Sequence, residues 1–568
     1  MPDLTHCPTC YRLAQVLKTR RREVATLSIG HFIAHETQLF CPHCVGRPVF
    51  VASELHQRVP RGARYGYDVM EQVGRALFLQ ARNTKQIQRE LGERNITISL
   101  REIDYLGRRF IVYLALAHRQ SKDRLKGLMA SRGGYILHLD GTCEGDSPHL
   151  ISSIDELSRI VLGNVKLPSE NADQLIPFLR QIQQAYGNPI ALVHDMGSAI
   201  LVAVKTVFPK IPDFICHFHF LKDIGKDLFG HEEGTLRRHL KTYAIRSHLR
   251  KTAKGLRKAI EADPGALDCL QRYLKSTLLG EAMVAPPPQV AAYLIISWVL
   301  EAKQACHGFG FPFDRPHLDF YRRMHEAYPT LKALKATMRQ DASLPLLAIS
   351  RTLADRALET TAARMQDKVR VFDRLREAMR IALPDSRKGL NDEGEGDIAT
   401  IKEYVSAFRY SPEIERLAET TTTYHNMIKQ IDKYWEKLFA DPIKVTTSDG
   451  TFTVQPQRTN NIMEQFFRGI KRAGRKRSGN SALTKMLKTM MAQTPLVKNL
   501  DNPQYMEILL NGTTTLAERF AQIDIDQVRR AFADSQVSAQ RYPKGMAKVF
   551  KQPNLPEKLA TLTLKMAA

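Results

Sequence analysis

Residues 135–140 read Tyr-Ile-Leu-His-Leu-Asp, and residues 189–195 read Pro-Ile-Ala-Leu-Val-His-Asp. Each is an apolar run of strand-forming residues that ends in an aspartate. Around these runs we predict further elements: strands at 149–154, 159–165 and 213–219, and helices at 169–186 and 198–207. The order β-β-β-α-β-α-β, with crossover helices between the later strands, predicts parallel pairing in an α/β core.

The two aspartates that end these runs, Asp140 and Asp195, are candidate metal ligands. If both strands are parallel members of one sheet, the two carboxylates emerge at the same edge, where open α/β sheets bind ligands. Two hard oxygen ligands at one edge suit Mg²⁺, which prefers carboxylates and keeps several waters. Three nearby acids follow the strand and therefore rank below Asp140: Glu144, Asp146 and Asp155.

The charge of the chain indicates a polyanionic partner. Its 568 residues contain 83 Lys and Arg against 59 Asp and Glu, which gives a net charge of +24. A protein this basic concentrates polyanions, of which nucleic acid is the usual one. The cations also cluster, at 20–22, 250–258 and 471–477. The alternative is a basic surface without a specific partner.

Composition and hydropathy exclude several classes of protein. Apolar residues at 43% and charged residues at 25% are near globular averages, which excludes wholesale disorder and collagen-like repeats. The longest apolar run, 290–300, is too short for the roughly 20 residues of a membrane span. The opening MPDLTHCPTC lacks the basic-then-apolar pattern of a secretory signal. We therefore expect a soluble, cytoplasmic, multidomain protein.

Four of the eight cysteines form two C-x-x-C pairs, Cys7 with Cys10 and Cys41 with Cys44. Each pair supplies two thiolates from one turn, so two pairs complete the tetrahedron that zinc prefers. We predict a structural zinc ribbon, with weak strands at 27–29 and 31–33; four reduced core cysteines are the alternative. A catalytic zinc is excluded because four thiolates leave no open position. The remaining cysteines are scattered: Cys143, Cys216, Cys269 and Cys306.

Residues 66–120 have the pattern of consecutive helices. Apolar residues recur at helical spacing over 69–81, and Asn83 with Gln86 has the spacing of a capping box that opens a short helix ending at Gly92. Ser99 with Glu102 then opens a longer helix. This arrangement resembles a helix-turn-helix whose last helix offers cations to DNA: Arg101, Arg108 and Arg109. A plain helical connector has the same spacing and remains the alternative.

The second half of the chain is predicted to be mostly helical. Residues 221–440 are helical in pattern, with breaks at 286–288 and 384–396, and 443–447 and 451–454 form a predicted hairpin with Asp-Gly at its turn. A helix follows over 461–471. Its Glu464 has two structural interpretations, a capping box with Asn461 and an i,i+4 pair with Arg468.

A cationic run follows this helix and offers a second surface for phosphates. Beside a site that acts on DNA it would neutralise the backbone with salt-dependent, sequence-independent affinity. A solvated basic loop is the alternative. The run comprises Lys471, Arg472, Arg475, Lys476 and Arg477.

Four stretches together resemble the DDE transposases of bacterial insertion sequences, whose catalytic domain is ribonuclease-H-like. They are HLDGT at 138–142, LVHDMGSAI at 192–200, ICHFHFLKDIGKDL at 215–228 and RTNNIMEQFFRGIKR at 458–472. Cys216 and His219 resemble the C-x-x-H that follows the second aspartate in Mutator-like and related elements. A helical insertion separates the second aspartate from the glutamate in those elements; here that gap is 269 positions and helical in pattern.

The resemblance implies catalytic, metal-binding roles for Asp140, Asp195 and Glu464. In that family two Mg²⁺ (or Mn²⁺) ions flank the scissile phosphate, one activating the nucleophile and one stabilising the leaving 3′ oxygen. Water is the first nucleophile and frees a 3′-OH at the element end, which then attacks target DNA. The implied partners are element ends and target DNA, bound by a homo-oligomer, a dimer or larger. DNA would also associate the protein with the nucleoid.

The expected architecture is multidomain α+β, a ribonuclease-H-like core interrupted by an all-α insertion. The expected segments are a zinc ribbon (1–60), helix-turn-helix-like DNA-binding helices (61–125), the first part of the core (126–229), the insertion (230–440), the helix of the third carboxylate (441–485) and a helical tail (486–568).

Cys216 and His219 fall on the strand predicted at 213–219, which would point them to opposite faces. We therefore expect a structural or DNA-positioning role near the site, with an added metal as the minority interpretation. Two alternatives to a transposase remain open: a catalytically idle, transposase-derived DNA-binding regulator, and a nuclease that cuts DNA without joining it.

Overall fold

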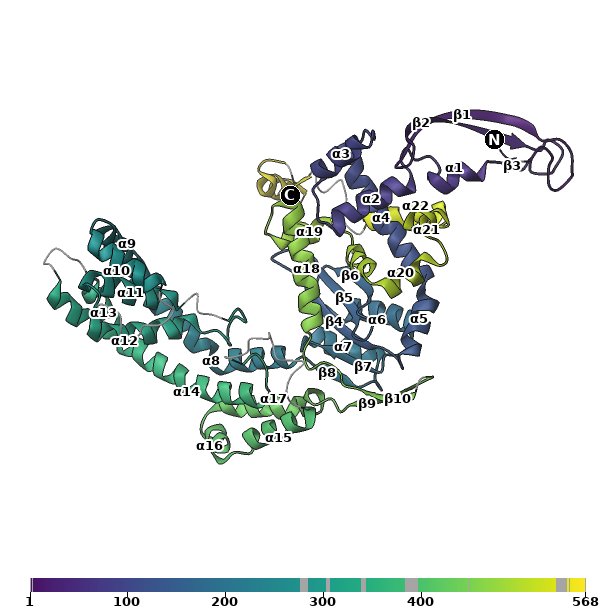
Figure 1. Ribbon diagram of the computed structural model, residues 1–568. Coiled ribbons are helices and arrows are strands. Elements are labelled where there is room, and N and C mark those ends of the chain that lie inside the picture. The colour runs from purple at the N-terminus through teal and green to yellow at the C-terminus, as the bar shows by residue number, and fades with distance from the viewer. Residues whose placement is uncertain are drawn as a thin grey trace. The chain divides into compact units, whose positions relative to one another are not determined.

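The protein folds into two compact units, each with most of its residue contacts inside itself (Figure 1). Unit 1 comprises Met1–Asp213, Ile443–Val454 and Asn460–Ala568, and unit 2 comprises Phe214–Pro442 and Gln455–Thr459. The computed structural model describes residues 2, 4–275, 285–302, 307–338, 344–383, 397–448, 450–537, 549–550 and 552–566. The predicted break at 384–396, Cys306 and Asp449 of the predicted turn lie outside the described residues.

The core of unit 1 is a sheet with the strand order β6-β5-β4-β7-β8. Strand β4 pairs antiparallel with β5 and parallel with β7, and β5 pairs antiparallel with β6. The predicted parallel pairing of the two aspartate-bearing runs is confirmed. The strands are β4 (Ile136–Thr142), β5 (His149–Asp155), β6 (Val161–Leu167), β7 (Ala191–His194) and β8 (Asp213–Ile215).

Apolar residues on the sheet and on the neighbouring helices form one core in unit 1. Ile136, Leu137 and Leu139 of β4 are fully buried, as expected of a strand covered on both faces. Helix α6 (Ala172–Tyr186) buries Leu175 and Leu179 in the same core, and α7 (Ser198–Val207) has the predicted bounds. The sheet is therefore rigid where Asp140 leaves it.

The predicted strand at 213–219 is wrong beyond Ile215. Helix α8 (His217–Thr242) begins two residues later, with Cys216 as its N-cap residue. The aromatic run Cys-His-Phe-His-Phe satisfies strand preferences locally, but its apolar residues Phe218, Leu221 and Ile224 continue at helical spacing and are buried. Helical packing decides the conformation of this segment.

Of the two predicted N-terminal strands, 31–33 lies within a longer strand, whereas 27–29 is not a strand. Strands β1 (Gln15–Thr26) and β2 (Gly30–Phe40) form an antiparallel hairpin, and residues 27–29, predicted as a strand, are its turn. Most of β1 is exposed, so its polar sequence carries no apolar alternation that would have revealed it. Strand β3 (Val49–Phe50) and helix α1 (Ser53–Arg58) follow.

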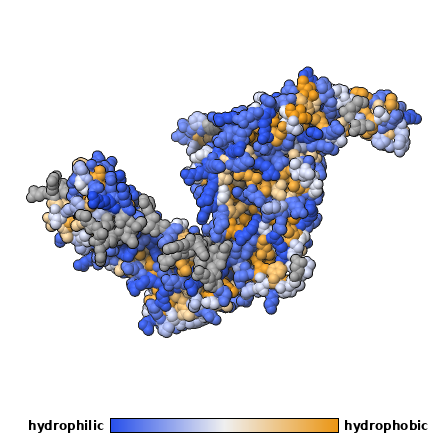
Figure 2. All heavy atoms as spheres, in the orientation of Figure 1, coloured by the Kyte–Doolittle hydropathy of each residue, from blue (hydrophilic) through white to orange (hydrophobic). Residues whose placement is uncertain are grey.

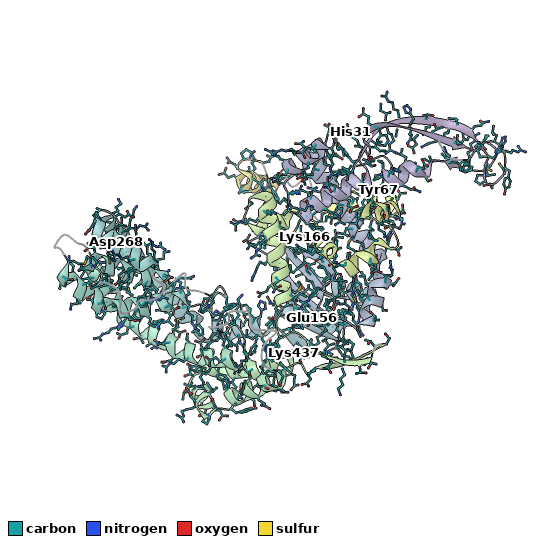
Figure 3. All side chains as sticks on the ribbon, in the orientation of Figure 1. His31, Tyr67, Glu156, Lys166, Asp268 and Lys437 are labelled. Carbon is teal, nitrogen blue, oxygen red and sulfur yellow. The ribbon has the colours of Figure 1, made fainter. Side chains whose placement is uncertain are left out.

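The predicted helices after the hairpin are confirmed. Asn83 forms the predicted capping box with Gln86, and Ser99 accepts a hydrogen bond from the Glu102 N–H. The second half of α4 is buried on all sides, which is typical of a helix inside a core. The helices are α2 (Tyr67–Phe78), α3 (Thr84–Glu93), α4 (Leu100–Gln120) and α5 (Lys122–Ser131). The start of β2 contacts the loop between α3 and α4, because the Thr97 N–H donates to Nε2 of His31, which Figure 3 labels.

Unit 2 contains the whole of the segment predicted as an all-α insertion, and its described residues are mainly helical. After α8 its helices are α9 (Ile245–Glu261), α10 (Pro264–Lys275), α11 (Pro288–Glu301), α12 (Pro316–Thr337), α13 (Leu346–Leu353), α14 (Arg356–Ala378), α15 (Ile398–Arg409), α16 (Pro412–Thr420) and α17 (Thr422–Leu438).

The C-terminal part of unit 1 begins with the predicted hairpin, β9 (Ile443–Thr447) and β10 (Gly450–Val454). Helix α18 (Asn461–Ser478) follows and contacts β4. The remaining elements are α19 (Leu483–Thr489), the 3₁₀ helix η1 (Thr494–Asp501), α20 (Pro503–Leu510), α21 (Leu516–Ala521), α22 (Ile525–Val537) and α24 (Leu555–Met566). Among the described residues, no helix combines the length and apolarity needed to cross a membrane.

Candidate functional site

The predicted acids lie on three elements of unit 1. Asp140 is the fifth residue of β4, Asp195 directly follows β7, and Glu464 is in the first turn of α18. In the parallel register Leu139 pairs with His194, so the next residue of each chain segment is one of the two aspartates. Strand β4 runs on to Thr142, so Asp140 lies within the strand and not at its end as predicted.

Asp140 is buried among other carboxylates. Only 8% of its surface is exposed, and it accepts a hydrogen bond of 2.7 Å from the Gly141 N–H. Burial raises the pKa of Asp140 well above its ordinary value, and the negative charges of Asp195, Glu464 and Glu170 raise it further. The sequence-predicted acids therefore act on one another electrostatically, and a fourth carboxylate joins them.

That fourth acid, Glu170, was missed in the sequence. A Cβ atom built on Gly197 would lie 2.7 Å from Glu170 Oε1 and 3.1 Å from Asp195 Oδ1, so both carboxylates border this glycine. Burial raises the pKa of Glu170, the charge of Asp195 raises it further, and His149, 3.7 Å away, lowers it. Glu170 directly precedes the N-cap residue of α6, and acids near a helix N-terminus are common because they stabilise the helix. The sequence therefore gave no reason to assign Glu170 to the site.

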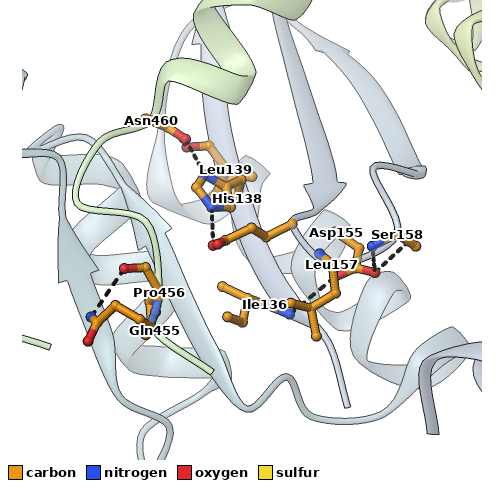
Figure 4. A network of polar contacts seen from close by, with 10 residues as sticks. Ile136, His138, Leu139, Asp155, Leu157, Ser158, Gln455, Pro456 and Asn460 are labelled. Atoms are coloured by element: carbon orange, nitrogen blue, oxygen red, sulfur yellow. Dashed lines mark hydrogen bonds and ion pairs between the residues drawn. The ribbon is translucent and has the colours of Figure 1, made fainter. Parts of the chain in front are cut away.

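Buried hydrogen bonds connect the residue before α18 to β4 (Figure 4). They hold the first turn of α18, which contains Glu464, against this strand. Asn460 Oδ1 lies 2.8 Å from His138 Nδ1, and Asn460 Nδ2 donates to the Leu139 carbonyl at 3.0 Å. His138 Nε2 in turn lies 2.9 Å from Glu156 Oε2. The Asn460 side chain thus holds the helix one turn before Glu464 against the strand that bears Asp140.

This arrangement contradicts the capping-box interpretation of Glu464. The N-cap residue of α18 is Asn460, one position earlier than the Asn461 that a capping box with Glu464 requires. No side-chain hydrogen bond caps this helix end. Tertiary contacts of Asn460 with β4 set the helix start, which the local spacing of Asn461 and Glu464 does not reveal.

The three rival acids have structural partners. Glu144 accepts a hydrogen bond of 2.9 Å from the Thr484 N–H at the start of α19, and this bond is the main cause of its lowered pKa. Asp146 pairs with Lys488 at 2.7 Å on the surface. Asp155 accepts hydrogen bonds from its own turn, including one from the Leu157 N–H at 3.1 Å. Their contacts agree with ranking them below Asp140.

The acids do not form a closed single-ion cluster. Among the described residues, the four N-terminal cysteines are the only group of three or more His, Cys, Asp or Glu whose ligand atoms all lie within 4.8 Å of one another. Two ions about 3.5–4 Å apart, each with ligands at about 2.1 Å, separate their outermost ligands by up to roughly 8 Å. Among the described residues, no three of the acids therefore meet this single-ion criterion, whereas a pair of ions allows wider ligand separations.

The cysteine cluster has the dimensions of a tetrahedral metal site. Cys7 Sγ lies 3.7 Å from Cys44 Sγ, and Cys10 Sγ lies 3.4 Å from Cys41 Sγ. Zinc–sulfur bonds of about 2.3 Å in a tetrahedron place sulfur atoms roughly 3.8 Å apart. The four side chains can therefore hold a structural metal such as zinc, as the two C-x-x-C pairs predicted.

The thiols of this cluster cannot all ionise without a cation. Burial raises the pKa of Cys7, but N–H groups of Cys10 and Thr9 and the neighbouring thiols bring it to about 6. Hydrogen bonding with Cys10, followed by burial, raises the pKa of Cys44 to about 12. A bound divalent cation removes this conflict by stabilising every thiolate at once.

The predicted DNA-binding cations divide into exposed and packed residues. Arg109 bonds to the Tyr113 hydroxyl at 3.2 Å, and the Arg477 guanidinium lies 5.3 Å from the centre of the Phe78 ring. The basic run is not a loop, because α18 continues through it to Ser478. The exposed cations are Arg101 and Arg108 on α4 and Lys471, Arg472, Arg475 and Lys476 on α18.

Cys216 and His219 belong to unit 2 and lie at the start of α8. The prediction that they face opposite sides of a strand is wrong, since residues three apart at a helix start share a face. Cys216 is buried and His219 is half-buried against the ring of Phe218.

Comparisons with known proteins identify no relative from which a function could be inferred. No protein-family model matches this chain, and no curated protein matches its sequence.

Proposed function

We propose that this chain is a DDE transposase of a bacterial insertion sequence, with a ribonuclease-H-like catalytic core. The proposal rests on the buried carboxyl of Asp140. Its pKa is raised by burial and by the negative charges of Asp195, Glu464 and Glu170. Like-charged carboxylates destabilise one another unless a cation offsets them. Such a cluster, with Asp140 inside β4 and Asp195 directly after the parallel strand β7, fits cation binding better than a structural role.

Asp140, Asp195 and Glu464 would hold two Mg²⁺ or Mn²⁺ ions, and Glu170 is a fourth candidate. When bound, the ions supply nucleophile activation and stabilisation of the leaving 3′ oxygen. The hard oxygen donors of these carboxylates fit such metals. Asn460 and His138 hold α18 against β4, so they keep Glu464 positioned for both reaction steps.

Two phosphoryl transfers follow from one site. First, a water oxygen attacks the phosphorus at the element end, the P–O3′ bond breaks, and the 3′ oxygen leaves as a hydroxyl. That 3′-OH then attacks a phosphorus of target DNA, and the target 3′ oxygen leaves in the same way. The exposed cations of α4 and α18 would neutralise phosphates on either side of the cut.

The test compares nicking of supercoiled plasmid by the wild-type chain and by Asp140→Asn, Asp195→Asn and Glu464→Gln, with Mg²⁺ and without divalent metal. We expect Mg²⁺-dependent nicking that each variant reduces by at least about 100-fold. Asp146→Asn is the matched control, because Asp146 is exposed and paired with Lys488. Equal nicking by the wild type and all three variants would contradict the proposal.

A second assay separates transposition from hydrolysis. A duplex with a pre-cut 3′-OH end is offered together with a target plasmid, and the joined product is measured. Joining supports a transposase, and hydrolysis without joining supports a nuclease. DNA binding without either reaction supports the catalytically idle regulator.

A further inference from the structure

A long acid-free segment lies in unit 2. Residues 234–260 contain nine Lys and Arg and two His, and no Asp or Glu. The whole chain contains 59 acids in 568 residues, and an ordinary solvated surface mixes both signs of charge. This segment carries positive charges only. The segment covers the last third of α8 and nearly all of α9.

Helix α9 sorts this segment into an apolar and a cationic face. Its buried residues are Ile245, Leu249, Leu256 and Ile260, which lie on one side of the helix. Lys251, Lys254 and Lys258 are exposed on the opposite side, at i, i+3 and i+7 spacing. Successive lysines are therefore about 4.5–6 Å apart along the helix axis.

The three lysines form no ion pair with an acid of the described residues. Among the described residues, the ion pair of α9 is Arg257 with Glu261, and none of the ion pairs involves Lys251, Lys254 or Lys258. Like charges three and four residues apart destabilise a helix. The arrangement therefore costs stability, which points to a role outside the unit's own folding.

A glycine lies beside these lysines. Gly255 is exposed in the interior of α9, and a Cβ atom built there would meet nothing within 4 Å. Glycine weakens a helix interior, so packing does not explain it. It leaves the backbone open to a large partner that lies across the lysine face.

The apolar side of α9 argues against a membrane surface. Helices that bind membranes insert an apolar face between lipids. Here that face is covered: α9 packs on α11, α10 and α13, and Ile245 and Ile260 are fully buried. Figure 2 shows a mainly hydrophilic surface where Figure 1 labels α9, and Figure 3 labels Asp268 on the neighbouring α10.

We propose that the Lys251, Lys254 and Lys258 face of α9 binds the phosphate backbone of duplex DNA, independently of base sequence. This inference rests on the proposed function only for the choice of DNA as the polyanion. It gives the helical insertion a second DNA contact, separate from the acids and from the cations of α4 and α18.

The test uses the full chain with Lys251→Gln, Lys254→Gln and Lys258→Gln combined. Binding to a random-sequence 30-base-pair duplex is titrated at several salt concentrations without added divalent metal. Each lost phosphate contact lowers the slope of log K against log salt by about 0.9. We expect the slope to fall by about 2–3 and the affinity at 0.1 M salt to fall at least about tenfold.

The matched control combines Lys332→Gln, Arg416→Gln and Lys429→Gln, three exposed cations of unit 2 on α12, α16 and α17. It removes the same charge, and thermal unfolding checks that both variants fold like the wild type. Equal slopes for the two triple variants would overturn the proposal, because a general charge effect would then explain binding. Undiminished DNA binding, with lost binding to vesicles of anionic lipid, would overturn it in favour of a membrane.

This result is independent of the plasmid-nicking assay. If α9 binds DNA while Asp195→Asn nicks as well as the wild type, the surface stands and the enzyme proposal fails. If Asp195→Asn abolishes nicking while the α9 variant binds DNA normally, the enzyme proposal stands and the surface fails.

Discussion

Among the acids of the site, Asp140 has a strongly raised pKa. Its carboxyl is buried, and three other carboxylates act on it. A raised pKa means that the folded chain holds a proton here that the unfolded chain releases at lower pH. Asp140 therefore contributes stability at low pH, and that contribution is lost as the pH rises through its folded-state pKa.

Asp140→Asn should stabilise the chain at neutral pH in the absence of Mg²⁺. The amide removes the cost of ionising a buried acid, so the Tm of the variant should exceed that of the wild type by a few degrees at pH 8. The difference should shrink toward pH 4, where the wild-type carboxyl is protonated. Thermal unfolding across this range measures it, with Asp146→Asn as the exposed control. A wild type that is more stable at every pH would contradict this account.

Glu170→Gln should weaken the response to metal without abolishing catalysis. Glu170 borders Asp195 across Gly197, and removal of an outer ligand or partner typically costs 10–100-fold in metal affinity. The Mg²⁺ concentration for half-maximal nicking should rise about tenfold. Glu403→Gln, an exposed position on α15, is the control. An unchanged Mg²⁺ dependence would remove Glu170 from the site.

At the scale of elements, α18 depends on a tertiary contact that its own sequence does not specify. Asn460 is the N-cap residue of the helix, but its side chain bonds to His138 and Leu139 of β4 and not to the helix. The sequence therefore predicted the helix from residue 461, where α18 does begin, but the capping-box spacing made Asn461 and not Asn460 its N-cap residue. For the same reason residues 213–219 were predicted as a strand, because the packing of α8 is decided by residues far along the chain.

Asn460→Ala should lower both stability and nicking. Loss of two buried hydrogen bonds leaves polar groups of β4 unpaired, which costs about 1–3 kcal/mol. Asn502→Ala is the matched control, since Asn502 is also an N-cap residue, that of α20, and bonds to the Ser158 carbonyl. Both should destabilise unit 1, but only Asn460→Ala should reduce nicking by the folded protein. Equal activity of the two variants would contradict the positioning role.

The cysteine cluster should bind one zinc ion per chain. Cys10→Ser and Cys41→Ser should each lose the metal and lower the stability of the N-terminal hairpin, because metal binding is coupled to folding at such sites. Metal analysis of the purified chain measures the stoichiometry. Cys143→Ser, at an exposed cysteine outside the cluster, should keep it. Full zinc content in Cys10→Ser would exclude the four-thiolate site.

At the scale of the whole molecule, the +24 charge should make DNA binding strongly salt-dependent. Six exposed cations on α4 and α18, if all contact phosphates, predict a fall of at least about 10³-fold in affinity between 50 and 200 mM salt. Fluorescence anisotropy with a random duplex measures this. A salt-independent affinity would contradict a phosphate-based interaction.

Some features of the fold and of the site could be predicted from local sequence patterns, and others could not. Asp140 and Asp195 end strongly apolar runs, and the C-x-x-C pairs have fixed spacing, so local pattern sufficed for them. Glu170 and the N-cap role of Asn460 depend on which segments meet in space, and no local pattern records that. Strand β1 was missed because it is mostly polar and exposed, and β2 was predicted only at 31–33 because it buries polar residues such as Glu36 and Gln38.

Helix α18 carries Glu464 in its first turn and Arg475 near its end, as one continuous rod. Eleven residues of α-helix span about 16 Å, roughly the length of five base pairs at 3.4 Å each. In the proposed function, a duplex that contacts Arg475 would therefore reach Glu464 at this fixed distance. The protected footprint should extend about this far from the cut, whatever bases lie between.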